Sequence, residues 1–261
     1  MKAIKIILII TAFISFGNKQ AAAQVDTVFW FAAPWVTPDH ANNVPMAFHF
    51  STFTNATTIR LRQPASVYDT TFIVAPNTLF SKYVSHLLDS LESKPADSVI
   101  NRGFEITSDF PVVAVYDFQS SGNNPETYSL KGQNGMGYEF ITPFQTLWNN
   151  KTLGGGQIQP YQFFSVVAAE DNTTIYITPK CDVVGGHPAN VTYSVYLPIA
   201  GQVYTCQNIT QATSVSGQSL AGSVITSDKK ISVTVNDDSV NPSGGGGCYD
   251  LLGDQIVPTD V

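Results

Sequence analysis

Residues 103–115 read GFEITSDFPVVAV, and residues 222–234 read GSVITSDKKISVT. The two stretches share Gly, Ile-Thr-Ser-Asp and the apolar alternation that follows, without a gap and 119 residues apart. A side-chain period of two is typical of a β-strand. Ser-Asp favours a tight turn, because both side chains bond to nearby backbone amides. The phrase therefore predicts a β-hairpin corner that occurs twice, with a binding role for Asp109 and Asp228 as the alternative.

A second phrase supports a duplication of the whole chain. ATTIRL at 56–61 returns as NTTIYI at 172–177, and a weaker match relates FWF at 29–31 to YEF at 138–140. Phrases that recur in the same order at similar spacing indicate an internal repeat. Each unit would have about 115 residues, the size of one β-sandwich. We expect one unit at 24–134 and a second at 135–261.

The rest of the chain has the pattern of an all-β protein. Short runs of alternating β-branched and aromatic residues are separated by Pro, Asn and Gly clusters, which favours sandwiches over alternating β/α units. The fold class predicted is two tandem antiparallel β-sandwich units with one short helix, from Tyr83 to Glu92. The expected strands are 28–31, 47–53, 58–61, 71–74, 112–116, 163–168, 174–178, 191–197 and 231–235.

The N-terminus has the layout of a signal peptide. Lys2 and Lys5 precede an apolar run at 6–16, which is too short to span a bilayer, and Ala21-Ala22-Ala23 offers a small-residue cleavage site. We expect residues 1–23 to be removed and the mature chain to start at Gln24; an uncleaved membrane anchor is the alternative. The product would be secreted or held at the cell surface.

Composition excludes two classes of partner. Charged residues make up 13% of the chain, and the formal net charge is −7. A nucleic-acid surface needs a basic face to meet phosphates, so nucleic acid is not expected as a partner. A polybasic membrane patch is excluded for the same reason, and no insertion in the membrane is expected after the signal is cleaved.

Three cysteines are present. Cys181 and Cys206 fall at predicted strand ends, 25 residues apart, and are the expected disulfide pair, because export permits disulfides. Cys248 follows a glycine run, and its thiol would be free or paired outside this chain. Without a C-x-x-C pair or a His/Cys cluster, a structural zinc site is not predicted.

Motifs for catalysis are missing from the sequence. It has no G-x-S-x-G, P-loop or H-E-x-x-H motif. His49 lies in an alternating strand and His86 on the expected helix, which favours packing or surface roles. We therefore expect no enzyme and no cofactor.

Two groups of residues are candidates for binding. Trp35 and Trp148 are near loops, where aromatic rings stack on sugars or anchor protein partners; packing at the rim of a core is the alternative. Carboxylates border the glycine run at 244–247, where oxygen ligands suit calcium and solvated turn residues are the alternative. This acidic group consists of Asp237, Asp238, Asp250 and Asp254. It would also serve an extracellular hydrolase, if two of its carboxylates faced each other across a groove.

Four phrases resemble those of a known family. They are DTVFWF at 26–31, ESKP at 92–95 with Gly103 and ITS at 106–108, EDNTTIYI at 170–177, and CYDLLGDQIVP at 248–258. In this order they are similar to the N-terminal domain family of the IgGFc-binding protein, which occurs in animal mucus proteins and in many exported bacterial surface proteins. The chain resembles a bacterial exported member. It ends at Val261, where the family pattern continues, so we expect a fragment.

The resemblance implies a non-catalytic extracellular interaction domain. We expect an adhesion module for a glycan, a mucin or a protein. A passive spacer within a larger surface protein and the hydrolase are the alternatives. No residue of this chain can be matched to an Fc contact, so Fc binding is not carried over.

Overall fold

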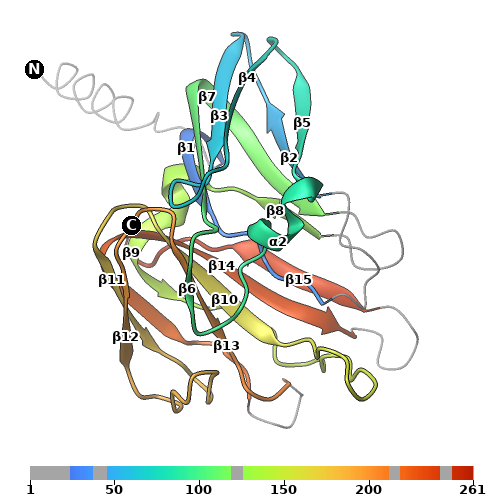
Figure 1. Ribbon diagram of the computed structural model, residues 1–261, viewed down its shortest axis with the longest axis vertical. Helices are drawn as coiled ribbons and strands as arrows, with labels where there is room; N and C mark the ends of the chain where they lie inside the picture. Colours follow the sequence, from blue (N-terminus) through green and yellow to red (C-terminus); the bar gives the residue numbers. More distant parts are fainter. Residues whose placement is uncertain (1–23, 38–45, 119–125, 212–217, 242–248, 261) are drawn as a thin grey trace, which may run out of the picture.

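The computed structural model describes residues 24–37, 46–118, 126–211, 218–241 and 249–260. The chain forms two curled antiparallel sheets, which lie one above the other in Figure 1. The predicted all-β fold is confirmed, and all nine expected stretches contain strand. Residues 1–23, which we expect to be a signal peptide, and Cys248 lie outside the described residues. None of the described helices could cross a membrane, given their length and polarity.

The first sheet has seven strands in the order β4-β3-β7-β2-β5, with β1 and β8 also paired to β7. The long strand β7 takes part in both halves of the curl: its first residues pair with β3, and its last residues pair with β2 and β8. The strands are β1 (Val25–Phe31), β2 (Met46–Ser51), β3 (Thr57–Arg62), β4 (Asp69–Val74), β5 (Leu79–Tyr83), β7 (Phe104–Phe118) and β8 (Glu126–Ser129).

The second sheet has eight strands in the order β12-β11-β14-β10-β13-β6, with β9 and β15 also paired to β14. Here β14 has the place that β7 has in the first sheet. The strands are β6 (Val99–Ile100), β9 (Met136–Ile141), β10 (Gln162–Ala168), β11 (Thr173–Thr178), β12 (Tyr193–Leu197), β13 (Val203–Gln207), β14 (Val224–Val240) and β15 (Asp250–Gln255).

The two sheets repeat each other strand by strand. Ile59 of β3 pairs with Ser108, and Ile175 of β11 pairs with Ser227, so both repeated phrases occupy equivalent positions. The weaker match is shifted by two residues. Phe29 of β1 pairs with Ile106 and Phe140 of β9 pairs with Ile225, so Phe29 corresponds to Phe140 in the repeat. The equivalent strands are β1/β9, β2/β10, β3/β11, β4/β12, β5/β13, β7/β14 and β8/β15.

The Ile-Thr-Ser-Asp phrase is not a hairpin corner, which corrects the prediction. The chain does not reverse there: β7 and β14 continue through the phrase, and the pairing with β1 and β9 is interrupted by a bulge. The Asp109 carboxylate accepts a hydrogen bond from Thr58 N, and the Asp228 carboxylate accepts one from Thr174 N, both at 2.7 Å. Each aspartate therefore binds the neighbouring strand, and the bulge bends one long strand.

The predicted helix is shorter than expected. β5 extends to Tyr83, and Val84 N donates to Met46 O. The first two residues of the expected helix therefore belong to the sheet. What remains is a 3₁₀ turn at Ser85–Leu87 followed by one helical turn, α2 (Leu88–Leu91). Val84 and Leu91 are both buried in the first core.

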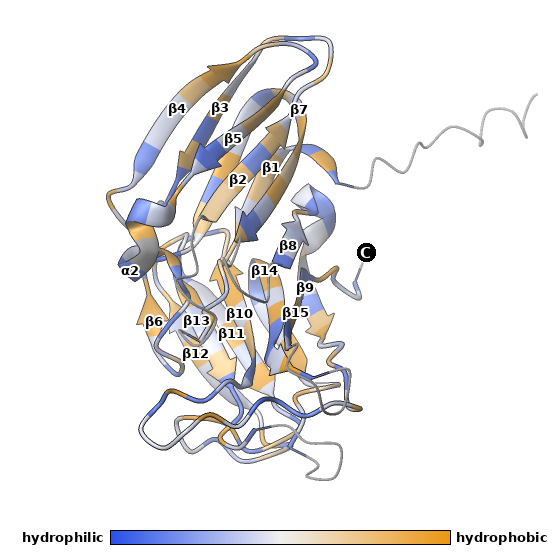
Figure 2. Cartoon of the chain, turned by 90° about the vertical axis from the view of Figure 1, so that its right-hand side faces the viewer, coloured by the Kyte–Doolittle hydropathy of each residue, from blue (hydrophilic) through white to orange (hydrophobic). Residues whose placement is uncertain are grey.

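Each sheet curls around its own hydrophobic core, and a third cluster lies between them. The strands alternate hydrophobic and hydrophilic residues along their length (Figure 2). Trp30 and Ala32 from the first sheet pack on Val167 and Val203 from the second. This apolar contact joins the two sheets. β8 ends at Ser129 and β9 begins at Met136; the domain limits stay a prediction.

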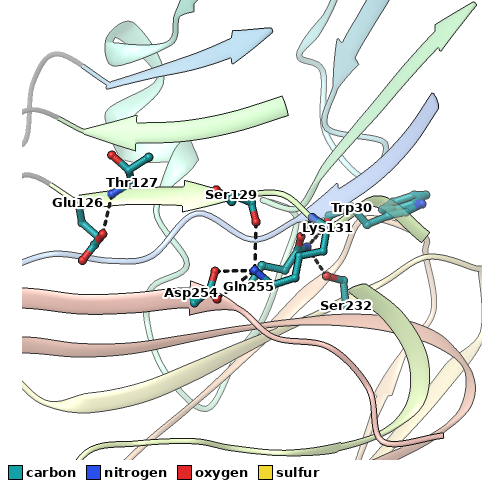
Figure 3. Close-up of polar contacts among 8 residues, drawn as sticks. All are labelled: Trp30, Glu126, Thr127, Ser129, Lys131, Ser232, Asp254 and Gln255. Atoms are coloured by element: carbon teal, nitrogen blue, oxygen red, sulfur yellow. Dashed lines mark hydrogen bonds and ion pairs between the residues drawn. The ribbon is translucent and has the colours of Figure 1, made fainter. Parts of the chain in front are cut away.

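Gln255 provides the polar part of this junction (Figure 3). Its side-chain amide donates to Trp30 O and to Ser232 Oγ, both at 2.6 Å, and its Oε1 accepts from Lys131 N at 2.6 Å. The side chain is buried. Gln255 therefore joins β1, β14, β15 and the connection that follows β8.

A second contact crosses the junction nearby. Tyr128 of β8 donates its hydroxyl to the side chain of Asn236 on β14. A Cβ at Gly253 would lie 2.2 Å from the Tyr128 hydroxyl oxygen, so only glycine leaves room for this ring. Close packing against the Tyr128 ring thus explains the glycine of the DLLGDQ strand.

Candidate functional site

The described parts of three connections meet at one end of the second sheet. They precede β10, follow β13 and connect β14 to β15; in Figure 1 the first is the yellow-green loop at lower right. Gln211 donates its side-chain amide to Lys151 O and Pro160 O, and Asn241 N donates to Asn149 O. The described parts of these loops therefore hold one another.

Trp148 is fixed in the first of these loops by Gln145. The Gln145 Oε1 atom accepts from Leu147 N at 2.9 Å and from Trp148 N at 2.8 Å, and its amide donates to Trp148 O at 3.0 Å. The same amide donates to the Asp237 carboxylate at 2.6 Å. The backbone of Trp148 is therefore tied to β14 through one side chain.

Asp237 is a buried carboxylate with three amide donors. Besides Gln145, it accepts from Asn150 Nδ2 at 2.7 Å and from Gln162 Nε2 at 2.9 Å. Burial raises the pKa of Asp237, and the three amide hydrogen bonds oppose that rise. This carboxylate holds both ends of the 145–150 loop and thereby positions Trp148.

The Trp148 ring is 37% exposed and lines a pocket of about 290 Å³. The Nζ atom of Lys151 lies 4.9 Å from the centre of the Tyr249 ring at the same pocket. We call this site the Trp148 pocket; its lining residues are Leu147, Trp148, Asn149, Asn150, Lys151, Thr152, Asn241 and Tyr249. Aromatic faces, amides and one cation, with no carboxylate in the lining, suit a neutral or acidic polar ligand such as a sugar.

Trp35 lies in a different environment. Its ring is 8% exposed, packs against Phe163 with 6.5 Å between the ring centres, and has Lys94 Nζ 5.7 Å from its centre. It lines a larger, more apolar cleft of about 670 Å³, together with Ile158 and Tyr161. Trp35 is thus buried against its neighbours, whereas Trp148 is partly exposed to solvent.

Asp238 faces away from the Trp148 pocket. Its carboxylate is buried and accepts from Thr37 N at 2.9 Å and from Ser239 Oγ at 3.3 Å. Burial raises the pKa of Asp238 to about 6. The adjacent residues Asp237 and Asp238 therefore anchor two different segments, the Trp148 loop and the segment that follows Trp35.

The other two acidic candidates are exposed on β15. Asp250 lies opposite Val240, and Asp254 accepts from Lys131 Nζ at 2.9 Å, at the junction. Asp237 and Asp254 do line one small pocket of about 260 Å³. No three His, Cys, Asp or Glu side chains in the described part of the chain are grouped to hold a metal ion. Since the glycine run at 244–247 lies outside that part, calcium stays a prediction.

Cys181 and Cys206 are buried neighbours. Both are free thiols in the structure. Burial raises the pKa of Cys206 to about 12, and Cys181 contributes to that rise. The disulfide between them stays a prediction.

One polar cluster was missed by the sequence analysis. His49 of β2 contacts Ser81 Oγ of β5 at 2.8 Å and Asp117 of β7 at 2.7 Å. These residues lie on three neighbouring strands and are far apart in the sequence. Only the register of those strands shows that the three side chains meet. None of the three pockets described above includes them.

Comparison with known proteins gives one match. A family model described as IgGFc binding protein matches residues 126–261, from β8 to the end of the chain. No curated protein and no solved structure matches the chain. The matched region contains the whole Trp148 pocket and Gln255.

Proposed function

The chain belongs to the IgGFc-binding protein family, a family of binding domains, and on that basis we propose that it is a non-catalytic module that is secreted or held at the cell surface. This module recognises a glycan or a mucin through the Trp148 pocket. The family match covers every residue of that pocket. A glycan-bearing protein such as a mucin would present the ligand in its natural form.

One observation carries the choice of this pocket. Trp148 is an exposed aromatic side chain whose backbone is held on both sides by Gln145. A ring on a fixed loop loses little conformational freedom when a ligand stacks on it. The lining also contains amide side chains and the Lys151 ammonium group, which are polar groups of the kind that line sugar-binding sites.

The acidic residues support binding more than hydrolysis. A glycosidase needs two carboxylates about 5–10 Å apart in a groove that reach the substrate. Asp237 is engaged by three side-chain amides, and Asp254 is engaged by Lys131. We therefore propose a structural role for Asp237 and no catalytic role for either.

The test is a glycan and mucin array with purified residues 24–261 and two variants. Trp148→Ala removes the ring from the pocket. Tyr176→Ala removes an aromatic ring that is 44% exposed on β11, outside the pocket lining, and serves as the matched control. We expect saturable binding by the wild-type chain and by Tyr176→Ala, and at least a tenfold loss for Trp148→Ala.

Two outcomes would contradict this function. Undiminished binding by Trp148→Ala would place the ligand elsewhere. A folded wild-type chain that binds nothing on the array would favour the spacer.

A further inference from the structure

The outer edge of β13 is occupied by a segment from the other half of the chain. Residues 92–103, here called the strap, leave the first sheet after α2 and cross to the second sheet, where β6 pairs with β13 (Figure 1). Asp97 N donates to Thr205 O, and Gly103 N donates to Gly201 O, both at 2.9 Å. The strap thus adds an extended strand to a sheet edge.

Side chains also hold the strap. Thr205 Oγ1 donates to Ser93 O at 2.8 Å, and Ser165 Oγ donates to Ser93 Oγ at 2.8 Å. The Asp97 carboxylate accepts from Tyr204 at 2.7 Å. Neighbouring hydroxyls on β10 and β13 are therefore the part of the sheet surface that binds the strap.

The equivalent edge of the first sheet is β5, and it pairs only with β2 among the described strands. Thr52 N donates to Thr78 O, and Val84 N donates to Met46 O, so the even-numbered residues of β5 bond towards β2. The backbone groups of Leu79, Ser81 and Tyr83 consequently point outwards. Their equivalents are Val203, Thr205 and Gln207; of these, Thr205 O and Gln207 O accept hydrogen bonds from Asp97 N and Val184 N.

The side chains beside this edge also fit a partner strand. Leu79 is 68% exposed and Tyr83 is 59% exposed. In the positions of Ser165 and Thr205 the first sheet has His49 and Ser81, which are joined by a hydrogen bond and half-buried. The first sheet therefore has the same pair of polar side chains, without a described segment over it.

We infer that the β5 edge binds an extended protein segment, which adds as an antiparallel strand in the way the strap adds to β13. The occupant is a polypeptide with strap chemistry: its backbone bonds the outward groups of Leu79, Ser81 and Tyr83, and a small hydroxyl residue meets His49 and Ser81. This surface is separate from the Trp148 pocket, so it does not depend on the proposed function.

A peptide with the strap sequence ESKPADSVINRG is the probe. Backbone amide shifts of the full chain are followed by NMR while this peptide is added. We expect saturable shifts at Leu79, Ser81 and Tyr83. Ser81→Pro removes the outward N–H, which the β2 ladder does not use, and should abolish these shifts. Lys82→Ala, which changes a side chain on the other face of β5 and keeps every outward N–H, should retain them and is the matched control.

Three outcomes would overturn the inference. They are the absence of shifts in β5 at millimolar peptide, equal shifts in the Ser81→Pro variant, and shifts confined to β13, which would mean that the peptide only exchanges with the strap. Wild-type resonances elsewhere in Ser81→Pro would show that the variant is folded.

Discussion

Asp237 is a buried carboxylate that holds the 145–150 loop through three amide donors. Replacing it with Asn puts an N–H group where amide donors now point. We expect Asp237→Asn to lower the free energy of unfolding by about 1–3 kcal/mol, because buried donors lose their acceptor. The same variant should weaken ligand binding, since Gln145 and Asn150 no longer fix the loop.

Urea unfolding and a binding titration measure these two effects. Asp250→Asn is the control, because Asp250 is exposed on β15 and should change stability by less than about 0.5 kcal/mol. Unchanged stability of Asp237→Asn would contradict the positioning role.

Asp238 gives a prediction for pH. Its pKa is about 6 in the folded chain, against an ordinary value of 3.8. Below pH 3.8 the carboxyl is protonated in both states; between pH 3.8 and 6 only the unfolded state loses the proton, so stability falls as pH rises. Relative to wild type, Asp238→Asn should therefore gain up to about 3 kcal/mol between pH 3.5 and pH 7.

Chemical unfolding of both proteins at these two pH values tests this. A stability difference that stays constant with pH would contradict the raised pKa, because it would mean that Asp238 has the same pKa in the folded and the unfolded chain.

At the scale of single residues, the sequence identified Trp148 and Asp237 but not the connection between them. Gln145 joins Trp148 to a carboxylate 92 positions away, which no local pattern encodes. The residues next to Trp35 in the sequence did not indicate that its ring would pack on Phe163. Such contacts follow from loop geometry, which composition and periodicity do not determine.

At the scale of elements, the repeated phrase makes the same contact twice. Asp109→Ala and Asp228→Ala each remove one hydrogen bond, to Thr58 N and Thr174 N. We expect each to cost about 0.5–1.5 kcal/mol and the double variant to show the sum, because the sites are far apart in separate sheets.

Thermal unfolding of the three variants measures these costs, with Asp89→Ala in the exposed part of α2 as a control. A loss from only one of the two aspartates would contradict their equivalence.

Strand existence could be predicted because alternation is a local signal. The bulge could not, since Ser-Asp favours a turn in isolation and only the partner strands β1 and β9 show that the chain continues. The helix was predicted too long because Val84, Leu87 and Leu91 have helical spacing, whereas Tyr83 lies opposite Ala47 of β2 and Val84 N donates to Met46 O.

At the scale of the whole molecule, the two sheets are joined by an apolar contact around Trp30 and a polar one around Gln255. Gln255→Ala leaves Trp30 O, Ser232 Oγ and Lys131 N without this partner. We expect a loss of about 2–4 kcal/mol, because buried polar groups that lose their partner each cost about 1–3 kcal/mol.

Differential scanning calorimetry measures the loss and shows whether the sheets still unfold together. Gln133→Ala is the matched control, because Gln133 is an exposed glutamine that contacts Asp26 near the same connection. A wild-type transition in Gln255→Ala would mean that Gln255 does not contribute to holding the sheets together.

The duplication was visible in the sequence, but the junction was not. The phrase DLLGDQI was recognised by resemblance, and only the structure explains two of its residues. Gly253 leaves room for the Tyr128 ring, and Gln255 donates a hydrogen bond to Trp30 O of β1. The strap also escaped prediction, because β6 has only two residues and pairs with a strand more than 100 positions later.

We propose that Trp148 is the contact point for a glycan or mucin ligand. The chain has three tryptophans, and Trp30 and Trp35 are buried, so ligand-dependent fluorescence reports mainly on Trp148. The most direct measurement is a fluorescence titration of residues 24–261 with mucin O-glycans. We expect a saturable change in tryptophan emission that disappears in Trp148→Ala. The same saturable change in that variant, or mucin binding with unchanged emission, would contradict it.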